Sequence, residues 1–216
     1  MKKFKLPVIF ALLSVLLLAC NTREIPENFD YGRVEGNVYS NDFFAFEMNV
    51  PKGWAVQSKE EMDKLSSAGG ELMAGDDEDY KKELKAAEIN SATLLSVFEH
   101  EVGTNVDYNP NFIVMTENIN GAVGVTDGAG YLDATKVQME RGQVKYDIIS
   151  GDYQEVNLGG TDFHKMDAAI TYAGITINQT FYSSIINGFA FNVIISYVTD
   201  EQKAVLEKVL DGMRFK

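Results

Sequence analysis

The sequence predicts a single α+β domain, a three-layer α/β/α sandwich around a central antiparallel sheet of about six strands. In the C-terminal third, three long runs of β-branched and aromatic residues are separated only by Ala173-Gly174 and Asn187-Gly188. Asn-Gly between such runs is the strongest short-range signal for a β-hairpin, and connections this short join antiparallel strands. Helical segments lie between and after the strands, so helices should cover the faces of one sheet.

The domain is expected to begin at Tyr39 and to run to the end of the chain. From Phe44 to Val50, large apolar residues alternate with smaller or polar ones, which is the pattern of a half-buried strand. Pro51 and Gly53 close this strand as a turn, and Trp54 starts another short extended segment.

Two short helices are expected next. Ser58-Lys-Glu-Glu61 matches the capping-box pattern and opens the first helix, which Gly69-Gly70 is expected to interrupt. The acidic run Asp76–Asp79 leads into a second helix, Tyr80–Glu88, where acids at the N-terminus complement the helix dipole.

The rest of the chain alternates strands with two further helices. The last helix opens with a second capping box, Thr199-Asp-Glu-Gln202, and carries an apolar stripe. The expected elements are strands 92–102 and 112–119, a Gly-rich loop 121–130, a helix 129–141, strands 145–149 and 153–158, strands 162–173, 175–186 and 189–198, and the final helix.

The first 19 residues have the pattern of a bacterial lipoprotein signal peptide. Three lysines precede a 14-residue apolar run, Leu6–Ala19, which is too short for a bilayer span of about 20 residues. The run ends in Leu17-Leu18-Ala19-Cys20, which resembles the lipobox of bacterial lipoproteins, although Leu18 is bulkier than the usual Ala or Ser. The resemblance implies cleavage before Cys20 and acylation, including palmitate, at this residue.

Acylation of Cys20 would anchor the mature protein to a membrane, because each buried methylene contributes about 0.8 kcal/mol. Cys20 is the only cysteine, so no thiol nucleophile, disulfide or thiolate metal site is expected. Residues 20–38 are polar and mixed and are expected to form a tether, although Tyr31 and Val34 could add a short strand to the domain. Asn21 after the cysteine favours the outer over the inner membrane, if the sorting rule of enteric bacteria applies.

The chain is strongly acidic, with a formal net charge of −13. Removal of residues 1–19 leaves 16 basic against 32 acidic residues, which is a net charge of −16. This balance argues against nucleic-acid binding and against docking on anionic lipid through a basic patch, since both require clustered cations.

Both ends of the domain resemble the PsbP-like family, whose members include an extrinsic subunit of the photosynthetic oxygen-evolving complex and many bacterial lipoproteins. At the start, the matching residues are Tyr39, Asn41, Phe46, Pro51, Gly53 and Trp54, with Ala45 in place of the usual glycine. At the end, they are Phe189–Tyr197, Thr199–Gln202 and Arg214-Phe215. The resemblance implies an α/β/α sandwich with a central antiparallel sheet. Its motifs are structural, so it supplies no activity.

Residues that could carry chemistry are few. His100, between Glu99 and Glu101 on an expected strand, and His164 could each act as a general base, but no Gly-x-Ser-x-Gly or His-Glu-x-x-His motif accompanies them. The Gly-rich loop 121–130 lacks the lysine of a phosphate-binding loop and favours a connection with Thr126 or Asp127 as N-cap. The acids Asp76–Asp79 do not have the spacing of a calcium loop, so no metal site or cofactor is expected.

Three functions remain open at this point. The first is a non-catalytic protein-binding or assembly module with an unidentified protein partner, favoured by the acidic surface and the missing catalytic motifs. The second is a lipoprotein that binds a small ligand or a cation in a pocket on the sheet. The third is an envelope hydrolase built from His100 or His164 with a nearby carboxylate.

Overall fold

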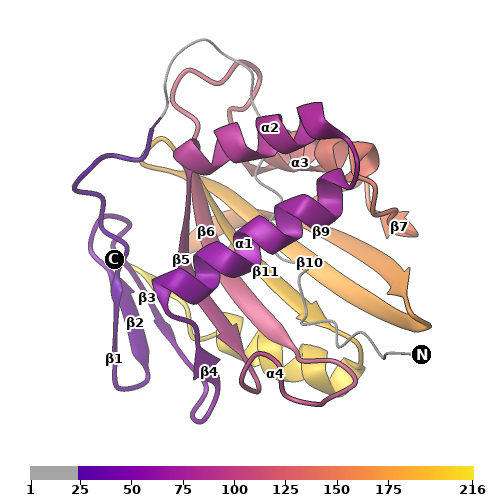
Figure 1. The fold of residues 1–216 in the computed structure, drawn as a ribbon. Helices are drawn as coiled ribbons and strands as arrows, with labels where there is room; N and C mark the ends of the chain where they lie inside the picture. Colours follow the sequence, from indigo (N-terminus) through magenta and orange to yellow (C-terminus); the bar gives the residue numbers. More distant parts are fainter. Residues whose placement is uncertain (1–23) are drawn as a thin grey trace.

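The computed structural model describes residues 24–216, so the predicted signal peptide and Cys20 lie outside the described residues. Most strands belong to one large antiparallel sheet (Figure 1). Its order is β4 (Ala55–Val56), β5 (Ser91–Phe98), β6 (Asn111–Asn118), β11 (Phe189–Tyr197), β10 (Ile175–Ile186), β9 (Thr161–Tyr172) and β7 (Ile148–Ile149), with β8 (Gln154–Leu158) also paired to β9.

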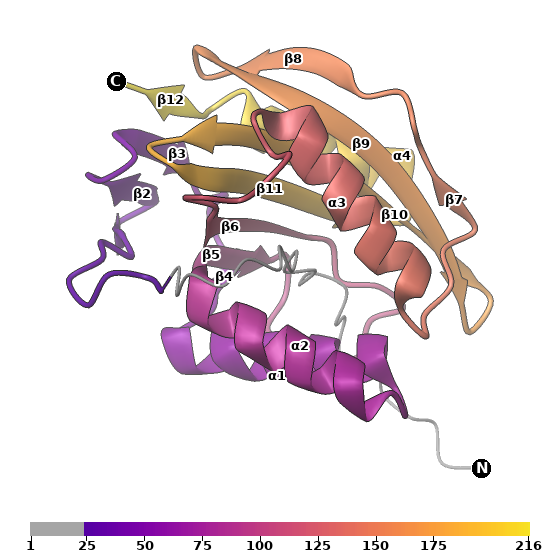
Figure 2. The ribbon, with the colours of Figure 1, turned by 90° about the horizontal axis from the view of Figure 1, so that it is seen from above.

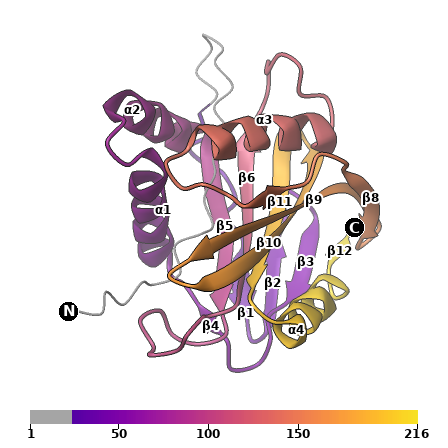
Figure 3. The ribbon, with the colours of Figure 1, turned by 90° about the vertical axis from the view of Figure 1, so that its right-hand side faces the viewer.

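A smaller antiparallel sheet and four α-helices complete the domain. The small sheet has the order β1 (Arg33–Glu35), β2 (Val38–Asn41), β3 (Phe46–Asn49) and β12 (Arg214–Phe215). The helices are α1 (Lys59–Ala74), α2 (Glu78–Ala87), α3 (Gly128–Arg141) and α4 (Asp200–Leu210), with a 3₁₀ turn η1 (Glu88–Asn90) after α2. In Figure 3, α3 lies across the front of the large sheet, and β2 and β3 lie behind it.

The α+β sandwich predicted from the sequence is confirmed. The large sheet has eight strands rather than about six. Its two-residue strands β4 and β7 lie in segments that the sequence predicted to be extended, and they join the sheet by pairing with β5 and β9.

The two faces of the large sheet pack against different elements. We call the face under α1, α2 and α3 the helical face, where Ile113, Phe181 and Ile194 contact side chains of these helices. The opposite face, here the apolar face, packs against α4 and the small sheet. Its core includes Phe112, Val114, Phe191, Val193 and Ile195 from the large sheet, Tyr39, Phe46 and Met48 from the small sheet, and Leu206 and Leu210 from α4.

The predicted hairpins β9–β10 and β10–β11 are present. Asn187 and Gly188 have φ angles of 53° and 81°, and Ala173 and Gly174 have φ angles of 51° and 84°. Both turns place two consecutive residues in the left-handed region, which matches the twist of the flanking strands.

Both predicted capping boxes are also present. The Ser58 hydroxyl accepts from the Glu61 N–H at the start of α1, and the Thr199 hydroxyl accepts from the Gln202 N–H at the start of α4. The expected break at Gly69-Gly70 is wrong, because α1 continues to Ala74. Gly69 is buried, and Gly70 lies beside Leu84 of α2, so helix packing offsets the roughly 1 kcal/mol that each helical glycine costs.

The described part of the expected tether, residues 24–38, is attached to the domain. It contains the short strand β1, and the Ile25 N–H donates to the Ile89 carbonyl at 3.0 Å. Phe29 is only 8% exposed, and its ring lies 5.3 to 6.1 Å from the rings of Phe43, Phe44 and Phe189. A single large aromatic in a polar segment produces no periodic pattern, so the sequence did not reveal this attachment.

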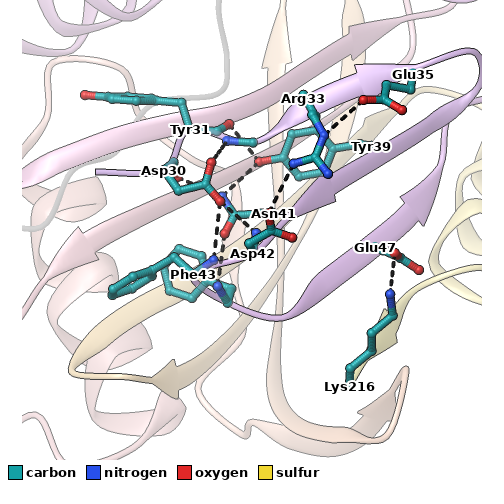
Figure 4. Close-up of polar contacts among 12 residues, drawn as sticks. Asp30, Tyr31, Arg33, Glu35, Tyr39, Asn41, Asp42, Phe43, Glu47 and Lys216 are labelled. Carbon is teal, nitrogen blue, oxygen red and sulfur yellow. Dashed lines mark hydrogen bonds and ion pairs between the residues drawn. The ribbon is translucent and has the colours of Figure 1, made fainter. Parts of the chain in front are cut away.

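Asp30 fixes the turn that follows Phe29 (Figure 4). One carboxylate oxygen accepts from the Gly32 N–H at 2.8 Å, and the other accepts from the N–H groups of Asp42 and Phe43 at 2.7 and 3.3 Å. Partial burial alone would raise the pKa of Asp30, but these three donors and the nearby Arg33 together lower it. Asp30 therefore joins the segment before β1 to the loop between β2 and β3.

The C-terminus closes the small sheet. β12 pairs with β3, and the Phe215 N–H donates to the Gly159 carbonyl in the turn between β8 and β9 (Figure 2). The two sheets are therefore held together at this corner.

Replacing Phe29 with Ala should destabilise the domain by about 3 kcal/mol, because it removes a buried aromatic ring and leaves a cavity. Urea unfolding followed by circular dichroism measures this free energy. The exposed Glu27, two residues earlier, provides the matched control, and Glu27→Ala should change stability by less than about 0.5 kcal/mol. Equal stability of the two variants would mean that residues 24–38 are a tether after all.

Candidate binding site

The helical face carries buried polar side chains among its apolar ones. On β11, Asn192 and Ser196 point to this face on either side of Ile194, and both are at most 5% exposed. The apolar face of the same strand carries only Phe189, Phe191, Val193, Ile195 and Tyr197. Polar groups in a sheet core need partners, so this asymmetry marks the helical face as the place to look for a site.

One polar row crosses four strands in register, and we call it the His164 row. Asn192 of β11 pairs with Ser183 of β10, Ser183 pairs with His164 of β9, and His164 pairs with Glu155 of β8. Cross-strand partners share a face, so these side chains are neighbours. The His164 Nε2 lies 3.7 Å from a carboxylate oxygen of the exposed Glu155.

The first turn of α3 covers this row. A Cβ on Gly128 would lie 2.1 Å from the Ser183 carbonyl oxygen and 3.0 Å from the His164 Nδ1, so only glycine allows the helix to begin here. Asp127 caps the helix by accepting from the Gly130 N–H at 2.8 Å, as the sequence predicted for the Gly-rich loop.

A buried carboxylate lies on the same face. Glu117 of β6 is 1% exposed, and its Oε2 accepts a hydrogen bond of 2.9 Å from the Tyr131 hydroxyl of α3. Glu117 pairs with Ser91 of β5, so it lies beside the first residues of that strand.

A second polar row, here the Asn111 row, lies nearer the other end of the central strands. Asn111 of β6 pairs with Ser196, and Ser196 pairs with Gln179 of β10. Gln179 donates to the Ser196 hydroxyl at 3.2 Å and accepts from the Tyr146 hydroxyl at 3.0 Å. The Tyr108 hydroxyl faces Ser196 and Asn111, and burial raises the pKa of Tyr108, so its phenol stays neutral at physiological pH.

Among residues 24–216, five buried side-chain atoms have no hydrogen-bond partner, and all five lie on the helical side of the sheet. Such atoms are rare in folded proteins, and bound water or a ligand is the usual explanation. They are Ser96 Oγ, Tyr108 Oη, Asn111 Oδ1, Gln138 Oε1 and Ser183 Oγ.

A cavity of about 340 Å³ opens where α1 covers the start of β5. Ser91 and Thr93 form its floor, and they pair with Glu117 and Met115 on the helical face. Its other lining residues are Tyr31, Lys59, Asp63, Ser66, Ser67, Glu88 and Ala92.

Contacts between α2 and α3 hold these two helices in place over the helical face. Arg141 forms two hydrogen bonds to Glu83 and lies over the Tyr80 ring, 4.3 Å from its centroid. The Tyr80 hydroxyl donates to the Gln138 carbonyl at 3.2 Å. The helices that carry Gln138 and cover the two polar rows are therefore held in one position.

The two histidines have different surroundings. The placement of His100 on a strand is wrong, because β5 ends at Phe98 and His100 lies exposed in the following turn. Asn109 accepts from the His100 N–H and donates to its carbonyl, which satisfies the backbone and ends the strand. His164 lies in the His164 row, but Ser183 is fully buried and its hydroxyl has no partner, so the two do not form a hydrogen-bonded nucleophile and base.

The acidic run is a helix start, as predicted. Asp77 caps α2 by accepting from the N–H groups of Asp79 and Tyr80. Within the described part of the chain, no group of three or more His, Cys, Asp or Glu residues is placed to hold a metal ion.

Sequence reasoning missed the residues of the Asn111 row and Glu117. Glu117 is the one ionisable residue in a strand that is buried along its whole length, which was a usable signal for a buried carboxylate. The Asn111 row gave no signal, because its members come from β6, β10 and β11 and only strand pairing brings them together.

Comparison with known proteins shows no family. No protein-family model and no curated protein matches the sequence. The resemblance to the PsbP-like family therefore stays a prediction.

Two solved structures are similar to this chain at low identity. One is a protein of Bacteroides thetaiotaomicron, with 14% identity and a TM-score of 0.46 over 85% of this chain and 49% of the other. The other is LpqN of Mycobacterium tuberculosis, described as involved in cell envelope biogenesis, with 14% identity and a TM-score of 0.42 over 78% and 82% of the two chains. This chain spans about half the length of the Bacteroides protein.

None of the helices within residues 24–216 has the length and apolar character needed to cross a bilayer.

Removing an unpartnered hydroxyl should stabilise the ligand-free protein, because no hydrogen bond is lost and a desolvated polar group disappears. We expect Ser96→Ala to raise the free energy of unfolding by about 1 kcal/mol. Ser196→Ala is the matched control, since this hydroxyl is equally buried but accepts from Gln179, and it should lower stability by about 1 kcal/mol. Urea unfolding measures both. A loss of stability in Ser96→Ala would show that its hydroxyl already has a partner, such as an internal water.

Proposed function

We propose that this protein is a lipid-anchored, non-catalytic binding protein of the bacterial envelope that holds a small polar molecule on the helical face of its large sheet. The observation that carries the proposal is the gathering of all five unpartnered buried side-chain atoms on that one face. A bound molecule with several donors and acceptors would satisfy the neighbouring members of this set, in the way that a few polar groups orient a ligand in most binding sites.

The anchor is supported by the lipobox-like sequence that ends at Cys20. The attachment of residues 24–38 gives this anchor a geometric consequence. Four residue steps separate Cys20 from Glu24, and a fully extended chain of that length spans at most about 14 Å. The domain would therefore lie next to the membrane surface, and Asn21 favours the outer membrane.

A non-catalytic role is supported by the burial of Ser183, which together with His164 and Glu155 forms the Ser-His-Glu row that we recognise on the described strands. Ser183 has no exposed surface, and Gly128 lies directly over its backbone. A nucleophile must reach its substrate, and this hydroxyl does not.

A small ligand accounts for more of the structure than a protein partner does. Apart from Tyr31, Val34, Val38 and Phe43 around the small sheet, the exposed large apolar side chains are spread over separate elements, for example Val123 in a loop, Val137 on α3 and Ile148 on β7. A protein partner, the function first favoured from the sequence, is kept as one outcome of the test below.

The binding function is tested by what the full chain retains when it is purified from its own envelope. Native mass spectrometry of the wild type should show a non-covalent mass that organic solvent releases. Asn111→Leu, which replaces one unpartnered group by an apolar one, should lose that mass, whereas Asn157→Leu at an exposed position of β8 should keep it. Copurification of a protein without any small molecule would favour a docking module instead.

Lipid attachment is tested at Cys20 itself. Cys20→Ala should abolish labelling by a radioactive or clickable palmitate and release the protein from the membrane fraction. Cys20→Ser tests the same thiol with a hydroxyl in its place and should behave identically. Unchanged labelling and fractionation of both variants would refute the anchor.

A further inference from the structure

We infer that the cavity between α1 and β5 on the helical face binds a neutral, hydroxyl-rich molecule of the saccharide class. This inference rests on the proposed function and specifies the class of ligand. It is argued from the lining, the charge and the size of the cavity.

Hydroxyl groups dominate the lining. Ser66 and Ser67 of α1 face the cavity from one side, and Ser91 and Thr93 of β5 face it from the sheet. The Ser91 hydroxyl donates to the Ala87 carbonyl at 3.0 Å and can still accept, whereas the other three can each donate one hydrogen bond and accept two. The four together therefore match a ligand that itself carries many hydroxyls.

The charges of the lining exclude an anionic ligand. Lys59 is its only cation, and the Lys59 Nζ lies 2.9 Å from both carboxylate oxygens of Asp63. Glu88 adds a second carboxylate, so the lining has a net charge of −1. A phosphate or carboxylate would have to compete with Asp63 for the lysine, whereas sugar hydroxyls can donate to both carboxylates.

Tyr31 supplies an apolar surface at the same cavity. Its side chain is 39% exposed, and the Phe29 ring contacts it edge-on at 5.4 Å between centroids. The Lys59 Nζ lies over one face of the ring, 5.5 Å from its centroid, so the other face is the one available to a ligand. An aromatic face with a polar tip suits a sugar ring, which presents C–H groups on its faces and hydroxyls around its edge.

Size and composition exclude two other classes of ligand. A volume of about 340 Å³ is at the lower end of the range for ligand pockets and suits one or two sugar rings. Ala92 is the only lining residue with a purely apolar side chain, so the cavity offers little to an acyl chain. Asp63 and Glu88 are too few to form a metal site of three acidic or histidine ligands.

The test uses the full chain in a detergent without a sugar headgroup, with maltose and N,N′-diacetylchitobiose as probes. Saturation-transfer NMR should show transfer from the protein to the ring protons of at least one disaccharide. Ser66→Leu fills the cavity and should weaken binding at least about ten-fold, because an inserted side chain cannot be accommodated beside the ligand. Ser67→Leu, at a more exposed lining position, provides a second variant that disturbs the helix less.

Lys64→Leu is the matched control, since it adds the same side chain to the exposed face of α1 outside the cavity. It should leave disaccharide binding within about two-fold, as expected of a surface substitution. Equal binding by the wild type and both serine variants would overturn the assignment to this cavity. Tighter binding of glucose 6-phosphate or spermidine than of either disaccharide would overturn the ligand class.

The two proposals fail in distinguishable ways. If the chain retains a small molecule from its envelope but binds neither disaccharide, the saccharide assignment is wrong and the proposed function stands. If it retains no small molecule and binds neither disaccharide, both are wrong.

Discussion

The burial of β11 on both faces is the constraint on which the rest of the structure depends. All nine of its residues are buried, and it pairs with β6 on one side and β10 on the other. A strand in this position must be covered by other elements on each face, because its apolar side chains have to be shielded from water. Its buried backbone groups have to be paired, which the two neighbouring strands achieve. The small sheet and α4 cover one face, and α1, α2 and α3 cover the other.

The elements that cover the two faces of β11 meet different physical requirements. Phe191, Val193 and Ile195 need only apolar neighbours, which the small sheet and α4 provide. Asn192 and Ser196 need hydrogen-bonding partners, and the helices satisfy this face only in part. Gln179 and Tyr146 complete one half of the Asn111 row, while Ser96 and Ser183 keep hydroxyls without partners. Buried polar groups that are left unsatisfied cost stability, and proteins keep them where they serve a function. The polar groups that the helices leave unsatisfied are therefore the reason for proposing a ligand on the helical face.

The attachment of residues 24–38 would link the proposed membrane anchor to the proposed binding site. Phe29 inserts between aromatic side chains of the domain, and Asp30 fixes the chain direction that follows. Tyr31 is brought to the cavity by these two neighbours. The segment that was expected to separate the domain from the membrane thus contributes to the site, and a ligand entering beside Tyr31 would do so close to the lipid surface.

The sequence by itself determined the elements whose signals are local. Asn187-Gly188 set a hairpin, because these residues accept the left-handed backbone, and Ser58 and Thr199 set two helix starts through their own hydroxyls. It also supplied the lipobox-like Cys20 and the acidic charge. The tertiary structure alone decided which polar residues meet, because Asn111, Gln179 and Ser196 come together through strand register between distant segments. It also decided that α1 continues through Gly69-Gly70 and that Phe29 is part of the core, since packing energy that no local pattern records outweighs the local preference in both cases.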